Sequence, residues 1–155
     1  ALFLTLFTMS PVVDEINEQA YKPYSAGEIT QEEFLQRAEK PLKEFMARQT
    51  ETRSLELFCD LAQVEAPEEE SQIDELPLRL LVPAFVTSEL KRAFMIGFYL
   101  YLPFVLIDVV VASTLMSMGM IMLPPSMISM PFKLLLFISL NGWELLFSTL
   151  VRGFN

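Results

Sequence analysis

Two long stretches without a charged side chain constrain this chain more than any other feature of its sequence. Residues 93–107 are 15 consecutive uncharged residues and residues 109–132 are 24, most of them apolar. A helix needs roughly 20 apolar residues to cross the hydrocarbon core of a bilayer, which is about 30 Å thick. The second stretch is long enough, but prolines interrupt it and exclude one straight spanning helix there. The two stretches therefore predict helices that meet at a turn in apolar surroundings.

The predicted fold is all-α and membrane-associated, with a long hydrophobic helical hairpin and a small acidic helical segment. The first helix of the hairpin is expected from about Pro83 to Met118 and the second from about Met127 to Val151, with a turn at residues 123–126. Phenylalanine and leucine occur on all sides of both expected helices, so neither helix has a polar face for bulk water.

Charge divides the chain near Leu76. The net charge is −9, but residues before this point carry 17 acidic and 6 basic side chains, whereas the later residues carry 3 and 5. We therefore expect residues 1–9 to be the end of a hydrophobic helix, residues 10–75 an acidic helical segment, and residues 76–155 the hairpin. No basic leader precedes residues 1–9, so the N-terminal hydrophobic region is expected to be truncated.

Composition excludes several classes of function. The chain has no histidine and a single cysteine, Cys59. These counts exclude catalysis by Ser-His-Asp or Cys-His groups, metal sites built on histidine or several thiolates, and an intrachain disulfide. The acidic balance argues against nucleic acid as a partner, because phosphate contacts need clustered lysine and arginine. We expect no enzymatic activity, no cofactor and no metal site.

Local patterns predict short helices in the acidic segment. Ser10 and Pro11 together are typical of a helix start, and residues 22–27, which include a proline and a glycine, should break the chain. Thr30 and Glu33 have the spacing of a capping box, in which each side chain bonds the other residue's backbone N–H.

Pro41 should kink or divide the helix that begins at this box, because proline lacks a backbone donor. A further short helix is expected to carry its apolar side chains on one side: Leu55, Phe58, Leu61 and Ala62. Residues 66–75 contain five acids and one proline, so they are predicted to be a linker.

Three charged residues lie within the predicted hairpin: Asp108, Lys133 and Glu144. A charge at the centre of a bilayer costs roughly 2.5–3.5 kcal/mol, so each should pair, face protein or line a wet path. Asp108 has two interpretations, a buried carboxylate bonded to a serine or threonine hydroxyl of a neighbouring helix, or a proton relay. Glu89 lies far from the turn and Lys133 close to it, so these two can pair only between staggered neighbouring subunits.

Six of the nine methionines fall within residues 116–130, here named the methionine-rich segment. Four of them occupy every second position: Met116, Met118, Met120 and Met122. Alternating residues scatter around a helix but project from one side of an extended loop, which Gly119 favours. The segment is either packing at a loop tip or a compliant seal around a pore, because methionine is flexible. The absence of charge suits a constriction that closes by dewetting.

Several motifs in this order closely resemble the FliP family of bacterial flagellar type III export gate subunits, which has the injectisome family SctR as a paralogue. The motifs are Thr8-Met9-Ser10-Pro11, Pro41-Leu42-Lys43-Glu44-Phe45-Met46, Pro83-Ala84-Phe85-Val86-Thr87-Ser88-Glu89-Leu90-Lys91, Ile96-Gly97-Phe98, Pro103-Phe104, Ile107-Asp108, Met118-Gly119-Met120-Ile121-Met122-Leu123-Pro124-Pro125 and Pro131-Phe132-Lys133. The resemblance covers almost the whole chain from residue 3 onward.

The resemblance implies roles for particular residues. A gate of methionines around the pore maps onto Met118, Met120, Ile121 and Met122. Relatives often carry a third methionine where Ile121 stands, and the β-branched isoleucine should be stiffer there. The resemblance also implies an ion pair between Glu89 and Lys133 of neighbouring subunits. Relatives commonly carry aspartate at the position of Asn141, so any ionic role there is absent from this chain.

The resulting prediction is a non-enzymatic pore subunit of the flagellar type III export gate, in the bacterial inner membrane at the flagellar basal body. The resemblance implies other copies of the chain, the companions FliQ and FliR, unfolded export substrates and the membrane as partners. The acidic residues 10–75 are assigned to the periplasmic side. Three alternatives remain open: the equivalent subunit of a virulence injectisome, a generic membrane channel, and a structural helical subunit.

Overall fold

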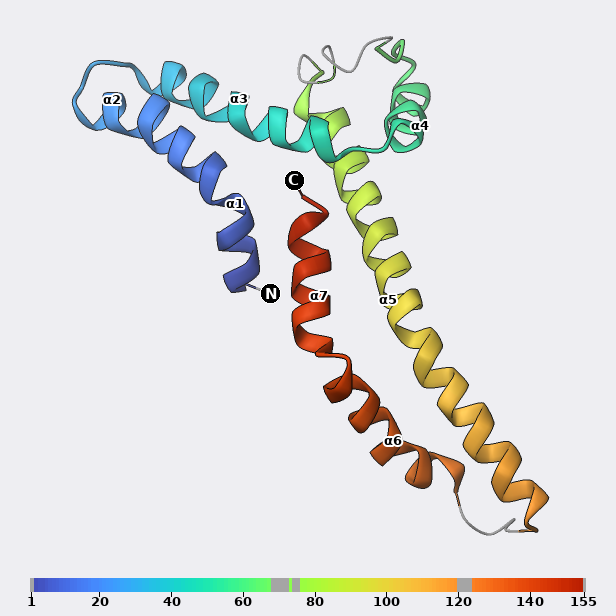
Figure 1. The fold of residues 1–155 in the computed structure, drawn as a ribbon. Coiled ribbons are helices and arrows are strands. Elements are labelled where there is room, and N and C mark those ends of the chain that lie inside the picture. The colour runs from blue at the N-terminus through green and yellow to red at the C-terminus, as the bar shows by residue number, and fades with distance from the viewer. Residues whose placement is uncertain (1, 68–72, 74–75, 120–123, 155) are drawn as a thin grey trace. The chain divides into compact units, whose positions relative to one another are not determined.

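The computed structural model describes residues 2–67, 73, 76–119 and 124–154, and every regular element among them is helical, so the all-α prediction is confirmed (Figure 1). The elements are α1 (Leu2–Ile16), the π-helix η1 (Asn17–Tyr21), α2 (Lys22–Ser25), α3 (Gln31–Gln49), α4 (Thr52–Ala62), α5 (Leu78–Ser117), α6 (Pro125–Ser139) and α7 (Gly142–Arg152). The chain divides into two compact units, residues 1–92 and 93–155.

The predicted helix start at Ser10 and Pro11 is wrong, because both residues lie inside α1. Proline has no N–H to donate to the carbonyl four residues earlier, which here belongs to Phe7. The Ser10 hydroxyl instead donates a hydrogen bond to the Phe7 carbonyl oxygen at 2.9 Å. This bond from the neighbouring side chain compensates for the missing donor, so α1 continues past the proline.

The helical run was predicted to break within residues 22–27, and it ends near the last of these residues, Gly27. The helical chain runs from α1 through η1 into α2, and the Lys22 N–H donates to the Asn17 carbonyl five residues earlier, which is the π-helical spacing. Pro23 is the second residue of α2. Gly27 then adopts a φ of +75°, a left-handed conformation that glycine enters without steric cost, and ends the helical run.

The capping box that begins α3 is confirmed. The Glu33 N–H donates to Thr30 Oγ1 at 3.3 Å, and the Thr30 N–H donates to Glu33 Oε2 at 3.0 Å. Pro41 does not divide the helix, because α3 continues from Gln31 to Gln49 with the proline buried inside it.

The first unit has an apolar cluster where α4 packs against the start of α5. Its buried members are Leu55, Cys59, Ile73, Leu81 and Ala84. Burying a side chain such as Leu81 stabilises the folded chain by about 2 kcal/mol. Leu61 was expected on this face of α4 but is 70% exposed, whereas Cys59 occupies the face instead. Ile73 anchors part of the predicted linker in the cluster.

Helix α5 is the one described helix that is long and apolar enough by itself to cross a membrane. It has 40 residues, so it is about 60 Å long, twice the thickness of a bilayer core. It begins five residues before the predicted start at Pro83 and ends at Ser117. Its first residues belong to the first compact unit and its remainder to the second.

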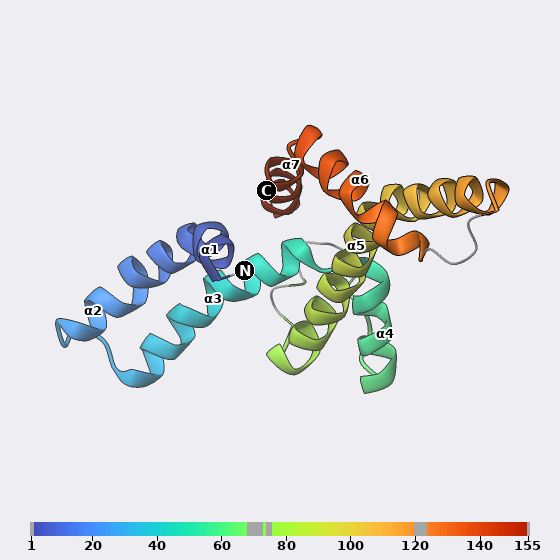
Figure 2. The same ribbon diagram turned by 90° about the horizontal axis from the view of Figure 1, so that it is seen from below.

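The second helix of the hairpin is not continuous as predicted. It consists of α6 and α7, which together are apolar enough for a span but are bent by 59° where they meet. Figures 1 and 2 both show the change of direction between these helices. The chain breaks because Asn141 adopts a left-handed conformation with φ of +48°, which an α-helix cannot contain.

Candidate functional site

An ionic cluster joins the two arms of the hairpin within the second unit. Lys133 Nζ of α6 lies 2.6 Å from Asp108 Oδ2 of α5. Ser129 donates its hydroxyl proton to Asp108 Oδ1, also at 2.6 Å, and its side chain is fully buried. Ser129 and Lys133 are four residues apart and therefore share one face of α6. Both oxygens of Asp108 thus have a partner on the opposite arm, and these contacts hold α5 and α6 together near the turn.

Asp108 accepts a hydrogen bond from the hydroxyl of Ser129 on α6, and its carboxylate is partly exposed rather than buried. Its role stays a prediction. The cation beside it, Lys133, was expected to pair with Glu89 of another subunit. Sequence reasoning did not single out Ser129. Its spacing of four residues from Lys133, on a mostly apolar helix, was the pattern that could have identified it.

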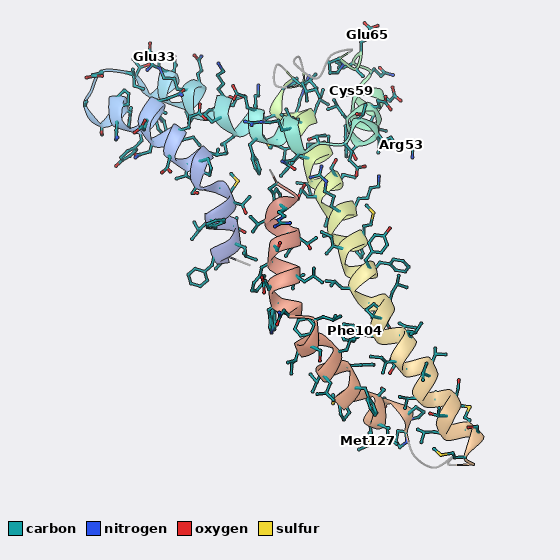
Figure 3. All side chains as sticks on the ribbon, in the orientation of Figure 1. Glu33, Arg53, Cys59, Glu65, Phe104 and Met127 are labelled. Carbon is teal, nitrogen blue, oxygen red and sulfur yellow. The ribbon has the colours of Figure 1, made fainter. Side chains whose placement is uncertain are left out.

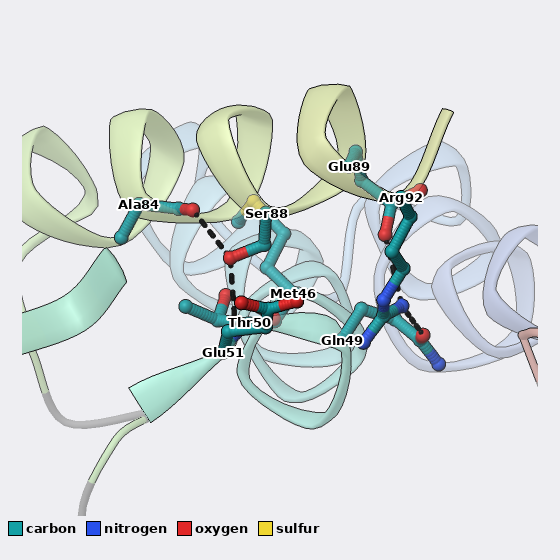
Figure 4. A network of polar contacts seen from close by, with 8 residues as sticks. All are labelled: Met46, Gln49, Thr50, Glu51, Ala84, Ser88, Glu89 and Arg92. Carbon is teal, nitrogen blue, oxygen red and sulfur yellow. Dashed lines mark hydrogen bonds and ion pairs between the residues drawn. The ribbon is translucent and has the colours of Figure 1, made fainter. Parts of the chain in front are cut away.

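Glu89 has its own cation within the first unit (Figure 4). Arg92 Nη1 donates to Glu89 Oε1 at 3.0 Å and to Gln49 Oε1 at 2.7 Å. Gln49 is buried at the end of α3. The guanidinium therefore fixes the Glu89 carboxylate relative to the end of α3. The pairing of Glu89 with Lys133 of a neighbouring subunit concerns contacts between chains and stays a prediction.

The corner between α3 and α4 is attached to α5 by hydrogen bonds that sequence reasoning missed (Figure 4). The Glu51 N–H donates to Ser88 Oγ at 2.9 Å, and this buried hydroxyl donates to the Ala84 carbonyl at 2.9 Å. The Glu51 carboxylate also pairs with Lys91. Glu51 and Ser88 are 37 residues apart, so no local pattern predicts their bond.

The described methionines near the turn are strongly exposed. Met116 in α5, Met118 just after it, and Met127 and Met130 in α6 are 64–71% exposed. Figure 3 shows Met127 at the end of α6 nearest the turn. Met118 N–H still donates to the Thr114 carbonyl. Met116 therefore lies in the helix that was expected to run to about Met118, and not in the extended conformation that the alternating methionines favour.

Three of the four predicted gate residues, Met120, Ile121 and Met122, lie outside the described residues. Gly119, which precedes them, has a φ of +74° and so directs the chain away from the helix axis of α5. No group of three or more acidic or cysteine side chains that could hold a metal ion occurs among the residues that the structure describes.

Known proteins resemble this chain along its whole length. The model of the FliP family matches residues 1–150. The flagellar biosynthetic protein FliP of Bacillus subtilis (strain 168) is 49% identical over 99% of this chain, that of Pectobacterium carotovorum subsp. carotovorum 50% over 99%, and that of Aquifex aeolicus (strain VF5) 49% over 100%. The chain spans 68%, 58% and 64% of these three relatives. With this match over nearly all its residues, the chain belongs to the FliP family.

Proposed function

We propose that this chain is a pore-forming core subunit of the bacterial flagellar type III protein export gate. Several copies assemble with FliQ and FliR in the inner membrane at the flagellar basal body, with residues 10–75 on the periplasmic side. Unfolded export substrates pass through a channel that the methionine-rich segment closes at rest. The relatives are flagellar biosynthetic proteins, which favours the flagellar gate over the injectisome.

The observation that carries this proposal is the exposure of methionines around an uncharged turn. Met116, Met118, Met127 and Met130 present flexible apolar side chains to the surroundings of a single chain. Exposed apolar side chains gathered in this way are typical of a surface that meets another protein or an apolar phase. In a ring of several subunits, such side chains would meet each other across the channel and exclude water from it.

Methionine suits a seal that must open for an unfolded chain. Its unbranched side chain has three rotatable bonds and a polarisable sulfur, so it adapts to surfaces of different shape. A passing polypeptide presents a new sequence of side chains at every step. Compliant contacts would close around each of them without binding any of them tightly.

The ionic cluster supports a rigid base for the proposed seal. Asp108 on α5 accepts hydrogen bonds from Ser129 and Lys133 on α6, and these bonds join the two helices. The methionine-rich segment can then deform while the two arms keep their spacing. A generic ion channel would require a polar pathway, and the described parts of α5 and α6 offer mainly apolar side chains.

The proposal predicts that replacing both Met120 and Met122 with alanine opens the channel to ions. Alanine removes the flexible side chains that exclude water but keeps the backbone and the helix ends intact. We expect raised ion conductance across membranes that contain the assembled complex, together with normal amounts of complex. The measurement is single-channel recording on the purified complex.

Met95 provides the matched control for this experiment. It lies on α5, away from the methionine-rich segment, and is also exposed. The Met95→Ala variant should leave conductance at the level of the unchanged protein. Unchanged conductance in an assembled complex of the Met120 and Met122 variant would contradict the proposed seal.

A further inference from the structure

The bend in the second arm of the hairpin has a backbone conformation that ordinary residues avoid. Between α6 and α7 the direction changes by 59°, and Asn141 adopts φ of +48° and ψ of +48°. Residues other than glycine enter this left-handed region at a steric cost, and this cost is smaller for asparagine than for most. Something else in the chain must therefore stabilise the bend.

A close packing contact that only glycine permits accompanies the bend. A Cβ atom built on Gly142 would lie 2.4 Å from two ring carbons of Phe137. Phe137 also contacts Trp143 edge to face, with ring centroids 5.3 Å apart, and Trp143 contacts Phe147 at 5.7 Å. The Phe137 ring thus fills the space beside Gly142 and holds α6 against the start of α7.

The bent state interrupts the hydrogen bonds of the helix. Leu145 N–H donates to the Asn141 carbonyl at 3.1 Å and opens α7, but the Asn141 side chain does not cap the helix. The first N–H groups of any helix have no carbonyl one turn earlier to bond. In apolar surroundings an unbonded amide is costly, so the bent state requires water or another protein at the start of α7.

A continuous helix is also compatible with this stretch of sequence. No proline occurs after Pro131 in α6 or α7. Leu140, with φ of −88° and ψ of 7°, and Asn141 would both need to enter the right-handed helical region, which is open to every L-residue. That change would bond the first amides of α7 to carbonyls of α6. It would also remove the strain at Asn141 and the close contact between Phe137 and Gly142.

We infer that residues 140–142 form a hinge with two positions, a bent one held by Phe137 packing on Gly142 and a straight one in which α6 and α7 are a single helix. Apolar surroundings favour the straight position, because in the bent position they offer no hydrogen-bond partner to the first amides of α7. The hinge lies outside the ionic cluster of Asp108, Ser129 and Lys133. Helix α7 can therefore change direction while α5 and α6 stay joined.

Two substitutions should move the hinge in opposite directions. Gly142→Ala places a methyl group against the Phe137 ring and raises helix propensity, so it favours the straight position. Asn141→Gly removes the steric cost of the left-handed conformation and weakens the continuous helix, so it favours the bent position.

A distance measurement between spin labels at positions 126 and 149 tests the hinge. Ser126 and Thr149 are exposed, and Cys59→Ala removes the native thiol. At 1.5 Å per residue a continuous helix separates these positions by about 35 Å, and a bend of 59° shortens the separation by about 4 Å from the same helix geometry. The measurement uses the full-length protein in lipid nanodiscs.

We expect Gly142→Ala to move the distance distribution to the longer value and Asn141→Gly to move it to the shorter one. The matched control is Gly153→Ala, which adds a methyl group at the other end of α7, where it meets only ordinary neighbours. This control should leave the distribution unchanged. Identical distributions for Asn141→Gly and Gly142→Ala would overturn the hinge. If Gly142→Ala fails to fold, identical distributions for Asn141→Gly and Asn141→Ala would overturn it instead.

Discussion

Cys59, which is labelled on α4 in Figure 3, belongs to the apolar cluster and has no exposed surface. Burial disfavours the charged thiolate, and the neighbouring Asp60 carboxylate repels it, so the pKa of the Cys59 thiol is raised above its ordinary value. The thiolate is the reactive form of cysteine. This residue therefore acts as a small apolar side chain of the core.

We predict that Cys59 reacts with maleimides at pH 7 at least about tenfold more slowly than an exposed thiol. The rate should rise as the pH increases above neutral, because a thiol with a raised pKa forms thiolate only at higher pH. The measurement is the rate of modification followed by mass spectrometry. The control carries Leu61→Cys with Cys59→Ala, which moves the thiol to an exposed position on the same helix. Equal rates for the two proteins would show that α4 does not pack as described.

For single residues, the sequence indicated the chemical type of a contacting side chain better than which residue supplies it. A hydroxyl partner was one of two interpretations of Asp108, and in the structure the Ser129 hydroxyl bonds this carboxylate. The cation Lys133 beside the same carboxylate was missed. The two positions are 25 residues apart, and their distance depends on how α5 and α6 pack against each other.

Among the helical elements, the start of α3 depends on its capping box. Thr30→Ala removes the hydroxyl that accepts from the Glu33 N–H, and the loss of such a cap costs about 1 kcal/mol. We predict about fivefold faster hydrogen exchange at the first amides of α3, since about 1 kcal/mol corresponds to that factor. Hydrogen exchange with mass spectrometry measures it. Thr30→Ser keeps the hydroxyl and should exchange like the unchanged protein, whereas equal protection in Thr30→Ala would contradict the box.

Helix ends were predictable only where a local bond decides them. Thr30 and Glu33 bond each other across three residues, so their pattern alone located the start of α3. Ser10 and Pro11 have a similar pattern, but the Ser10 hydroxyl bonds back to Phe7 and keeps α1 continuous. The end of α6 was not predicted, because no sequence pattern singled out the left-handed conformation of Asn141 or the packing of the Phe137 ring beside Gly142.

For the assembled molecule, the ion pair between Glu89 and Lys133 of neighbouring subunits is the sharpest prediction. Glu89→Lys should reduce assembly of the complex, because it places a cation beside Arg92 in its own chain and, under the predicted pairing, beside Lys133 of the neighbour. The double variant Glu89→Lys with Lys133→Glu should partly restore assembly. Native gel electrophoresis of the purified complex measures the amount assembled.

Lys133 already binds Asp108 within its own chain, so that contact needs a separate control. Asp108→Asn removes this carboxylate charge at nearly constant volume and leaves Glu89 and Lys133 unchanged. It should reduce assembly less than Glu89→Lys does. If the double variant assembles no better than Glu89→Lys, the predicted pair between subunits does not exist.

The sequence by itself determined the all-α fold class, the apolar hairpin, the capping box of α3 and the likeness to the FliP family. These features follow from composition, from helical periodicity and from bonds between residues at most four positions apart. The tertiary structure decided that Lys133 joins Asp108, that Glu51 bonds Ser88 and that the second arm bends at Asn141. The two pairs join residues 25 and 37 positions apart, and the bend depends on an aromatic ring against a glycine. Such contacts arise only when packing brings helix faces together, because no periodic pattern states which faces will meet.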